Sequence, residues 1–190
     1  MPIKNTICVV GNPNCGKTTL FNGLTGSNQI VGNWPGVTVE KKSGDFVYKN
    51  RHITIVDLPG IYSLQPSSAA SIDEKVARDY ILQNEAELVV NIVDASNLER
   101  NLYLTAQLIE MRVPMIVFVN MLDVAAAHKI EINIENLQRD LNCKVVGIVA
   151  SKEEGLKELC EAIDEQLDDL KTPPNPIAFH PDITEAIKQI

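Results

Sequence analysis

The chain has 190 residues, of which 45% are hydrophobic and 22% are charged, and its formal net charge is -8. This length and composition predict one substantial core and leave little room for a second complete domain. The acidic balance argues against sequence-independent binding of nucleic acid, which requires a basic face.

Cysteine usage and hydropathy indicate the compartment. The four cysteines are scattered without a C-x-x-C pair, and no segment resembles a signal peptide. This pattern is typical of reduced thiols in a cytoplasm. The longest apolar stretches, such as 115–119, are far shorter than the roughly 20 residues that cross a bilayer. We therefore expect a soluble domain on the cytoplasmic side.

Apolar, β-branched runs alternate with segments of helical spacing along the chain. The predicted strands are 7–10, 39–48, 53–56, 88–93, 115–119 and 145–149, with a turn at 49–52 that joins the second and third as an antiparallel hairpin at the edge of the sheet. The predicted helices are 17–24, 72–84, 98–111, 134–141 and 156–170. This order predicts a three-layer α/β fold, with a mixed, mostly parallel sheet of six strands and helices on both faces.

Three prolines interrupt the helical pattern within 171–176. We therefore predict a single folded domain over 1–170. Residues 171–190 are predicted to form a Pro-rich linker and the start of a further helix, which is truncated.

A complete G-x-x-x-x-G-K-[ST] motif follows the first strand and opens the first helix. Such a loop turns backbone N–H groups and a helix N-terminus toward phosphates. Lys17 supplies a cation to the β- and γ-phosphates, and the Thr18 hydroxyl supplies an oxygen to Mg²⁺. The alternative is a Gly-rich turn with an incidental lysine. The predicted phosphate-binding residues are Gly11, Asn12, Pro13, Asn14, Cys15, Gly16, Lys17, Thr18 and Thr19.

A second motif, D-x-x-G, ends the strand 53–56. Asp57 is predicted to hold Mg²⁺ through water, and the Gly60 N–H to bind the γ-phosphate. Ile61 stands where Ras-like enzymes carry a water-orienting glutamine, which predicts slow intrinsic hydrolysis.

A third motif, N-[KM]-x-D, selects the base. The Asp123 carboxylate can accept hydrogen bonds from guanine N1–H and its amine, whereas adenine offers no such donor pair. Asn120 is predicted to steady the phosphate loop, and Met121 lies between them. The alternative is a simple helix cap. The loop Ala150-Ser151-Lys152 is predicted to cover the base.

Between the first two motifs we predict a switch segment at Gly36, Val37 and Thr38, whose threonine reaches Mg²⁺ only when GTP is bound. Asn14 is a candidate ligand for a K⁺ ion that would take the place of an arginine finger. The alternative is that Asn14 only shapes the loop. The predicted catalytic set is Lys17, Asn14, Thr38 and Gly60.

The motifs together resemble the N-terminal G domain of the ferrous-iron transport protein B (FeoB) family, within the Ras-like P-loop GTPases. The most particular shared runs are Val31–Glu40 and Asp57–Leu64. The resemblance implies GTP and GDP as ligands, Mg²⁺ and K⁺ as cofactors, and a K⁺ site made of Asn14 with the backbone carbonyls of Gly32 and Trp34.

The resemblance also implies the whole protein: a bacterial inner-membrane Fe²⁺ transporter in which this domain acts as the cytoplasmic switch. Its partners would be the transporter's own helical and membrane domains, small accessory Feo proteins and further copies of itself. Two alternatives stay open, a soluble ribosome- or RNA-associated GTPase and a slow nucleotide-gated binding module.

Several other side chains have plainer interpretations. We assign His52, His128 and His180 to solvent, because none has metal-ligand spacing. Cys15 is interpreted as a variable loop position, and the acidic run 164–169 as the wet face of the last helix.

Overall fold

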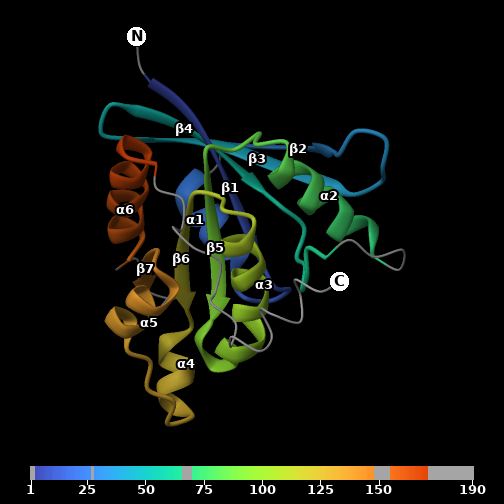
Figure 1. The fold of residues 1–190 in the computed structure, drawn as a ribbon. Helices are drawn as coiled ribbons and strands as arrows, with labels where there is room; N and C mark the ends of the chain where they lie inside the picture. The colour runs from blue at the N-terminus through green and yellow to red at the C-terminus, as the bar shows by residue number, and fades with distance from the viewer. Residues whose placement is uncertain (1–2, 27, 66–69, 148–154, 171–190) are drawn as a thin grey trace, which may run out of the picture.

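The computed structural model describes residues 3–26, 28–65, 70–147 and 155–170. Figure 1 shows a central sheet with helices packed on both of its faces. The strands are β1 (Ile3–Gly11), β2 (Gln29–Asn33), β3 (Glu40–Tyr48), β4 (Arg51–Asp57), β5 (Leu88–Asp94), β6 (Met115–Asn120) and β7 (Lys144–Gly147). The helices are α1 (Lys17–Thr25), α2 (Ile72–Leu82), α3 (Leu98–Glu110), α4 (Leu122–Ala127), α5 (Ile134–Leu141) and α6 (Leu156–Asp168), with a short 3-10 turn, η1 (Ala95–Asn97). The predicted three-layer α/β class is confirmed.

The strand order is β2-β3-β4-β1-β5-β6-β7. The strands from β4 to β7 in that order run parallel, while β3 pairs antiparallel with both β2 and β4. The carboxyl ends of parallel strands meet at one edge of a sheet, which is where open α/β folds bind ligands. The segments that follow β1, β4 and β6 therefore gather there, and these carry the three sequence motifs.

The predicted number of strands was wrong, because the sheet has seven strands rather than six. The additional strand is β2, which forms the edge of the sheet, so the β3–β4 hairpin lies one strand in from that edge. Its side chains are mostly solvent-exposed, including Ile30 at 67% and Val31 at 58%. A strand that buries neither face shows no alternation of apolar and polar residues, so its pattern resembled a loop.

Two local predictions also need correction. The turn at 49–52 is shorter than predicted, since Arg51 and His52 already pair with β1. Helix α4 was missed, because a helix of six residues is too short for its periodicity to be recognised.

Two separate hydrophobic clusters fill the layers on either side of the sheet. Helices α1 and α6 cover the face that carries Ile7, Val9 and Ile55. Helices α2 and α3 cover the opposite face, where they bury Cys8, Val10 and Val56. Alternate residues of β1 therefore belong to different cores, as expected for a central strand of a three-layer fold.

Arg51 joins three elements at the edge of the sheet opposite the motifs. Its Nε donates to Asp164 Oδ1 of α6 at 2.7 Å and its Nη1 to Asn5 Oδ1 of β1 at 3.2 Å, while Nη2 contacts Asp168. Asp164 is only 9% exposed, so the prediction that the whole run 164–169 is a wet face was wrong. Hydrogen bonding from Lys49, and then from Arg51, lowers the pKa of Asp164 despite its partial burial.

We expect Arg51→Met to lower the free energy of unfolding by about 3 kcal/mol, because it removes the buried guanidinium that bonds Asp164, Asn5 and Asp168 together. Urea unfolding measures this loss. Lys49→Met removes the other, 62% exposed, cation from Asp164, and is expected to cost less than about 1 kcal/mol. Equal losses in the two variants would contradict the assignment of Arg51 as the principal link. Because the pKa of Asp164 is lowered in the folded protein, its ion pairs stabilise the fold at neutral pH. This stabilisation is lost as the pH falls through the folded pKa of Asp164.

Candidate nucleotide-binding site

The first motif forms the loop between β1 and α1. Gly16 precedes the first residue of α1 with a left-handed backbone, φ 99°, and Asn14 is also left-handed at φ 65°. No side chain caps this helix N-terminus. Its first backbone N–H groups are therefore available to an anion, and the helix dipole favours negative charge there.

Asn120, at the end of β6, fastens this loop. Its Nδ2 donates to the carbonyl oxygen of Cys15 at 2.9 Å in a buried position, a contact of the kind expected of a residue that steadies the loop. The approach is so close that a Cβ atom at Gly16 would lie 2.1 Å from Asn120 Nδ2. The glycine is thus required by its φ and by its contact with the third motif.

Asp123 lies two residues beyond Met121, in the first turn of α4. Its side chain is exposed. Met121, which precedes α4, has a left-handed backbone with φ 61°. The β6 exit therefore carries one buried amide on the phosphate loop and one exposed carboxylate beside it. The N-[KM]-x-D motif predicts that the amide holds the loop and that the carboxylate binds the base.

Asp57 ends β4 beside the loop. Its Oδ1 atom is buried and has no hydrogen-bond partner in the described part of the chain. Burial raises the pKa of Asp57, while the charges of Lys17 and Lys42 lower it and that of Glu40 raises it. A desolvated carboxylate oxygen without a donor fits a cation, so the residues present suit the Mg²⁺ that the motif implies.

The segment after Asp57 packs directly on the phosphate loop. The Ile61 N–H donates to Gly11 O at 3.2 Å, and a Cβ atom at Gly60 would lie 3.2 Å from Lys17 Nζ. The Ile61 side chain is 1% exposed and belongs to the core beneath α2 and α3. The position that carries a glutamine in Ras-like enzymes therefore contributes packing here.

Sequence reasoning missed how the segment that follows Asp57 is held against α3. Gln107 of α3 accepts a hydrogen bond from the Leu64 N–H at 2.6 Å and donates to Ser63 Oγ at 3.1 Å. Arg100 lies about two turns earlier on the same side of α3, and its Cζ atom is 4.3 Å from the centroid of the Tyr62 ring. The available signal in the sequence was the polar Gln107 among the apolar residues of α3. The structure buries its side chain to 8% exposure.

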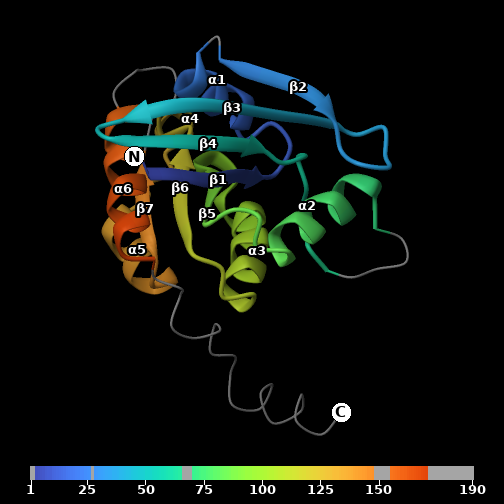
Figure 2. The same ribbon diagram turned by 90° about the horizontal axis from the view of Figure 1, so that it is seen from above.

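The first switch segment lies elsewhere. Trp34 follows β2, its N–H donates to Val39 O at 2.9 Å, and its carbonyl oxygen accepts from the Val37 N–H at 3.2 Å. In both ribbon views the β2–β3 connection runs beside α2 (Figures 1 and 2). Thr38 is exposed, and within the described ranges no hydrogen bond or ion pair joins it to the phosphate loop.

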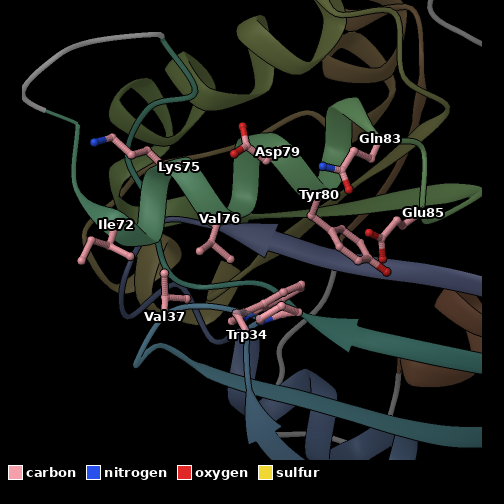
Figure 3. Close-up of a pocket in the computed structure, with 10 residues that line it drawn as sticks. Trp34, Val37, Ile72, Lys75, Val76, Asp79, Tyr80, Gln83 and Glu85 are labelled. Carbon is pink, nitrogen blue, oxygen red and sulfur yellow. The ribbon is translucent and has the colours of Figure 1, made fainter.

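Trp34 docks this segment on α2. Its indole ring, 7% exposed, meets Tyr80 edge-on with centroids 5.2 Å apart, and Lys41 Nζ lies 4.5 Å from the Trp34 centroid. Figure 3 shows the two rings at one end of a groove of about 380 Å³ that continues past Val37 and Val76 toward the start of α2.

The structure thus brings together the predicted residues of the phosphate loop, Asp57, Gly60 and Asn120, with Asp123 alongside. It holds Gly32, Trp34, Gly36, Val37 and Thr38 in a separate hairpin. Residues Ala150, Ser151 and Lys152 lie outside the described residues, as do His180 and the predicted linker 171–190.

Cys15 sits in the loop but is 1% exposed, and desolvation raises the pKa of its thiol to about 11 even though Lys17 acts in the opposite direction. Because only the thiolate is nucleophilic, we expect negligible alkylation of Cys15 in the native protein at pH 8, rising only as the pH approaches 11 or the chain unfolds. Mass spectrometry after iodoacetamide treatment, with the urea-unfolded protein as the reactive control, measures this. Rapid native labelling of Cys15 at pH 8 would show that the loop opens.

Two observations concern metals and membranes. Among the described residues, no three His, Cys, Asp or Glu side chains gather where they could hold a metal ion. In the same part of the chain, every helix is too short or too polar to traverse a bilayer. His52 and His128 are both exposed, as assigned.

A strand-loop-helix phosphate site, a carboxylate at the end of β4 and an asparagine that ties the base motif to the loop define the G domain of a P-loop GTPase. A family model described as Ferrous iron transport protein B matches residues 5–163. The chain belongs to the family of ferrous iron transport protein B.

Curated relatives and solved structures agree with this assignment. The chain is 55% identical over 162 residues to the Fe(2+) transporter FeoB of Escherichia coli (strain K12), and 54% identical over 162 residues to that of Salmonella typhimurium. Each alignment covers 85% of this chain and 21% of the relative, so the chain spans about a fifth of the length of these transporters.

Two solved structures extend the comparison. The cytosolic domain of L. pneumophila FeoB aligns with a TM-score of 0.86 at 41% identity, covering 97% of this chain and 78% of that one. The FeoB G domain from Methanococcus jannaschii aligns with a TM-score of 0.77 at 47% identity, covering 88% and 99%.

Proposed function

We propose that this domain binds guanine nucleotides with Mg²⁺, hydrolyses GTP slowly with stimulation by K⁺, and acts as the cytoplasmic switch of a bacterial Fe²⁺ transporter. The observation that carries the proposal is the hydrogen bond from Asn120 Nδ2 to Cys15 O, because it fixes the base motif against the phosphate loop. Relatives of similar sequence support the ligand, since T. maritima FeoB has been solved in a GMPPNP form that aligns at 40% identity with a TM-score of 0.87, covering 98% of this chain and 72% of that one.

The nucleotide would be held at both of its ends. Asp123 accepts from the guanine edge, while the uncapped N-terminus of α1 and the Lys17 ammonium receive the phosphates. The Gly60 backbone lies within reach of the same phosphates, because Gly60 packs against Lys17 and Pro13. Residues 150–152 remain a prediction for the other side of the base.

Thr18, Asp57 and Thr38 would hold Mg²⁺, the last only after a rearrangement. When bound, the metal neutralises charge on the β- and γ-phosphates and so assists attack by water. The Oδ1 atom of Asp57 is buried without a hydrogen-bond partner among the described residues, and such a cation would neutralise it.

The first switch would have to leave α2 for Thr38 to reach the phosphates. The same movement would bring the Trp34 carbonyl, which here accepts from the Val37 N–H, to where it could serve with Gly32 and Asn14 as a K⁺ ligand. The Asn14 side chain is exposed in the loop, so its amide oxygen could ligate K⁺. The hairpin docked on α2 is therefore interpreted as the inactive position of the switch.

The test is steady-state phosphate release from Mg-GTP in KCl and in NaCl at equal ionic strength, for the wild type, Asn14→Ala and Lys17→Ala. We expect selective stimulation by K⁺ that disappears in Asn14→Ala, while Lys17→Ala reports any contaminating activity. Equal rates in both salts would make Asn14 a structural residue. Absence of turnover with retained nucleotide binding would instead favour a nucleotide-gated binding module, which the buried Ile61 would suit.

For the full-length protein, we infer that the nucleotide state is passed to helical and membrane domains beyond this chain. Accessory Feo proteins and self-association stay predictions. Nucleic acid is not expected as a partner, given the net charge of -8.

A further inference from the structure

A lysine stands directly opposite the predicted metal-binding carboxylate. In the antiparallel β3–β4 ladder, Lys42 is the partner of Asp57. Side chains of directly opposed residues point to the same face, with Cβ atoms about 4.5 to 5.5 Å apart. Lys42 and Asp57 are therefore neighbours.

That shared face is the one covered by α1. Gly44, two residues from Lys42, lies so close to α1 that a Cβ atom there would be 2.5 Å from Thr25 Cγ2. Residues two apart on a strand share a face, so Lys42 lies on the α1 side of the sheet as well. Helix α1 begins at the phosphate loop, which places Lys42 in the layer that contains the proposed Mg²⁺ site.

Glu40 holds the Lys42 ammonium. The two side chains form an ion pair at 2.8 Å, with Lys42 34% and Glu40 56% exposed. The hydrogen bond with Glu40 does most to raise the pKa of Lys42, and the charges of Glu40 and Asp57 raise it further. Lys42 in turn acts against the burial that raises the pKa of Asp57. Lys42 thus forms an ion pair with an exposed carboxylate and, after Lys17, is the second cation that acts on the buried carboxylate of Asp57.

We propose that Lys42 is a positioning residue that serves Asp57 as a resident counter-cation in the metal-free protein and thereby competes with Mg²⁺. A fixed positive charge beside the carboxylate stabilises the empty site and repels an incoming divalent ion. Glu40 sets the strength of this competition by drawing Lys42 toward the surface. The inference deepens the proposed function and rests on it, because it concerns the metal that would accompany the nucleotide.

The experiment measures the Mg²⁺ concentration that gives half-maximal binding of a fluorescent GDP analogue. Lys42→Met is expected to lower this midpoint roughly 5- to 10-fold, the order expected for a screened unit charge near a divalent ion. Glu40→Gln is expected to raise it, and the double variant to match Lys42→Met, because Glu40 acts through Lys42. Lys42→Arg keeps the charge and should keep the midpoint near the wild-type value.

Thermal unfolding of the nucleotide-free protein in EDTA supplies a second readout. Lys42→Met should melt at a lower temperature than the wild type there, because Asp57 loses its counter-cation, even though its Mg²⁺ midpoint falls. A merely structural lysine would give the lower melting temperature with an unchanged or raised midpoint, and that result would overturn the inference. Lys157→Met, on the exposed face of α6, controls for the loss of one positive charge.

The two proposals fail in different ways. If the wild-type protein does not bind the GDP analogue either with or without Mg²⁺, then the proposed function itself is wrong. If it binds equally well in both conditions, then the role of Lys42 is wrong. If the wild type binds but the Lys42→Met and Glu40→Gln midpoints coincide with its own, then only the role of Lys42 is wrong.

Discussion

Gly16→Ala is expected to weaken GDP binding by about 100-fold or more, the largest effect we predict for a single methyl group. The new Cβ would lie 2.1 Å from Asn120 Nδ2, and a residue with a side chain would have to adopt φ 99°. Left-handed backbone costs a non-glycine residue roughly 1 to 2 kcal/mol, and loss of the Asn120 hydrogen bond adds about 1 kcal/mol more. The displaced loop would also turn its N–H groups away from the phosphates. Titration with a fluorescent GDP analogue measures the loss.

The same helix supplies the control. Gly26 ends α1 with φ 55°, but a Cβ atom there would meet nothing within 4 Å. Gly26→Ala should therefore lower stability through its backbone, by about 1 kcal/mol, and leave GDP affinity close to the wild-type value. If Gly16→Ala bound GDP as well as Gly26→Ala did, the contact between Asn120 and the loop would not matter for binding.

Asp123→Asn is expected to weaken GDP binding by about 100-fold or more and to shift the preference toward xanthine nucleotides. The carboxylate would accept two hydrogen bonds from guanine, each worth roughly 1.5 to 3 kcal/mol when one partner is charged. An amide offers one acceptor and one donor in their place. Xanthine, which carries a carbonyl where guanine has an amine, matches that pair. Competition of GDP and XDP for the fluorescent analogue measures both changes.

Asp73→Asn controls for the helix dipole, since Asp73 occupies the first turn of α2 as Asp123 does that of α4. Both substitutions remove a favourable charge from a helix N-terminus, worth about 0.5 kcal/mol. Only Asp123→Asn should alter the choice of base. Unchanged discrimination between GDP and XDP in that variant would leave Asp123 as a helix residue without a role in recognition.

The sequence predicted well what short local patterns determine. The strand-loop-helix context of Lys17, the position of Asp57 at a strand end and that of Asn120 after β6 all follow from motifs whose neighbours are adjacent in the chain. Buried strands such as β5 and β6 were also evident, because every residue of β6 except Asn120 is apolar, and all six are buried in the structure.

The sequence did not predict contacts between distant segments. Pairing of Lys42 with Asp57 depends on the register of a hairpin, and a slip of one residue would reverse the face on which each side chain lies. Attachment of Leu64 to Gln107 and of Trp34 to Tyr80 joins residues more than 40 positions apart. The edge strand β2 was missed because its stability comes from backbone pairing with β3 alone.

Trp34 is the chain's single tryptophan, so the packing of its ring on Tyr80 gives the domain an optical signal of its own. An indole shielded from water emits at shorter wavelength than a hydrated one, and a nearby tyrosine can pass its excitation energy to it. Movement of the first switch away from α2 would change both properties together. The intrinsic ultraviolet emission of the unlabelled protein therefore reports the position of one chosen segment.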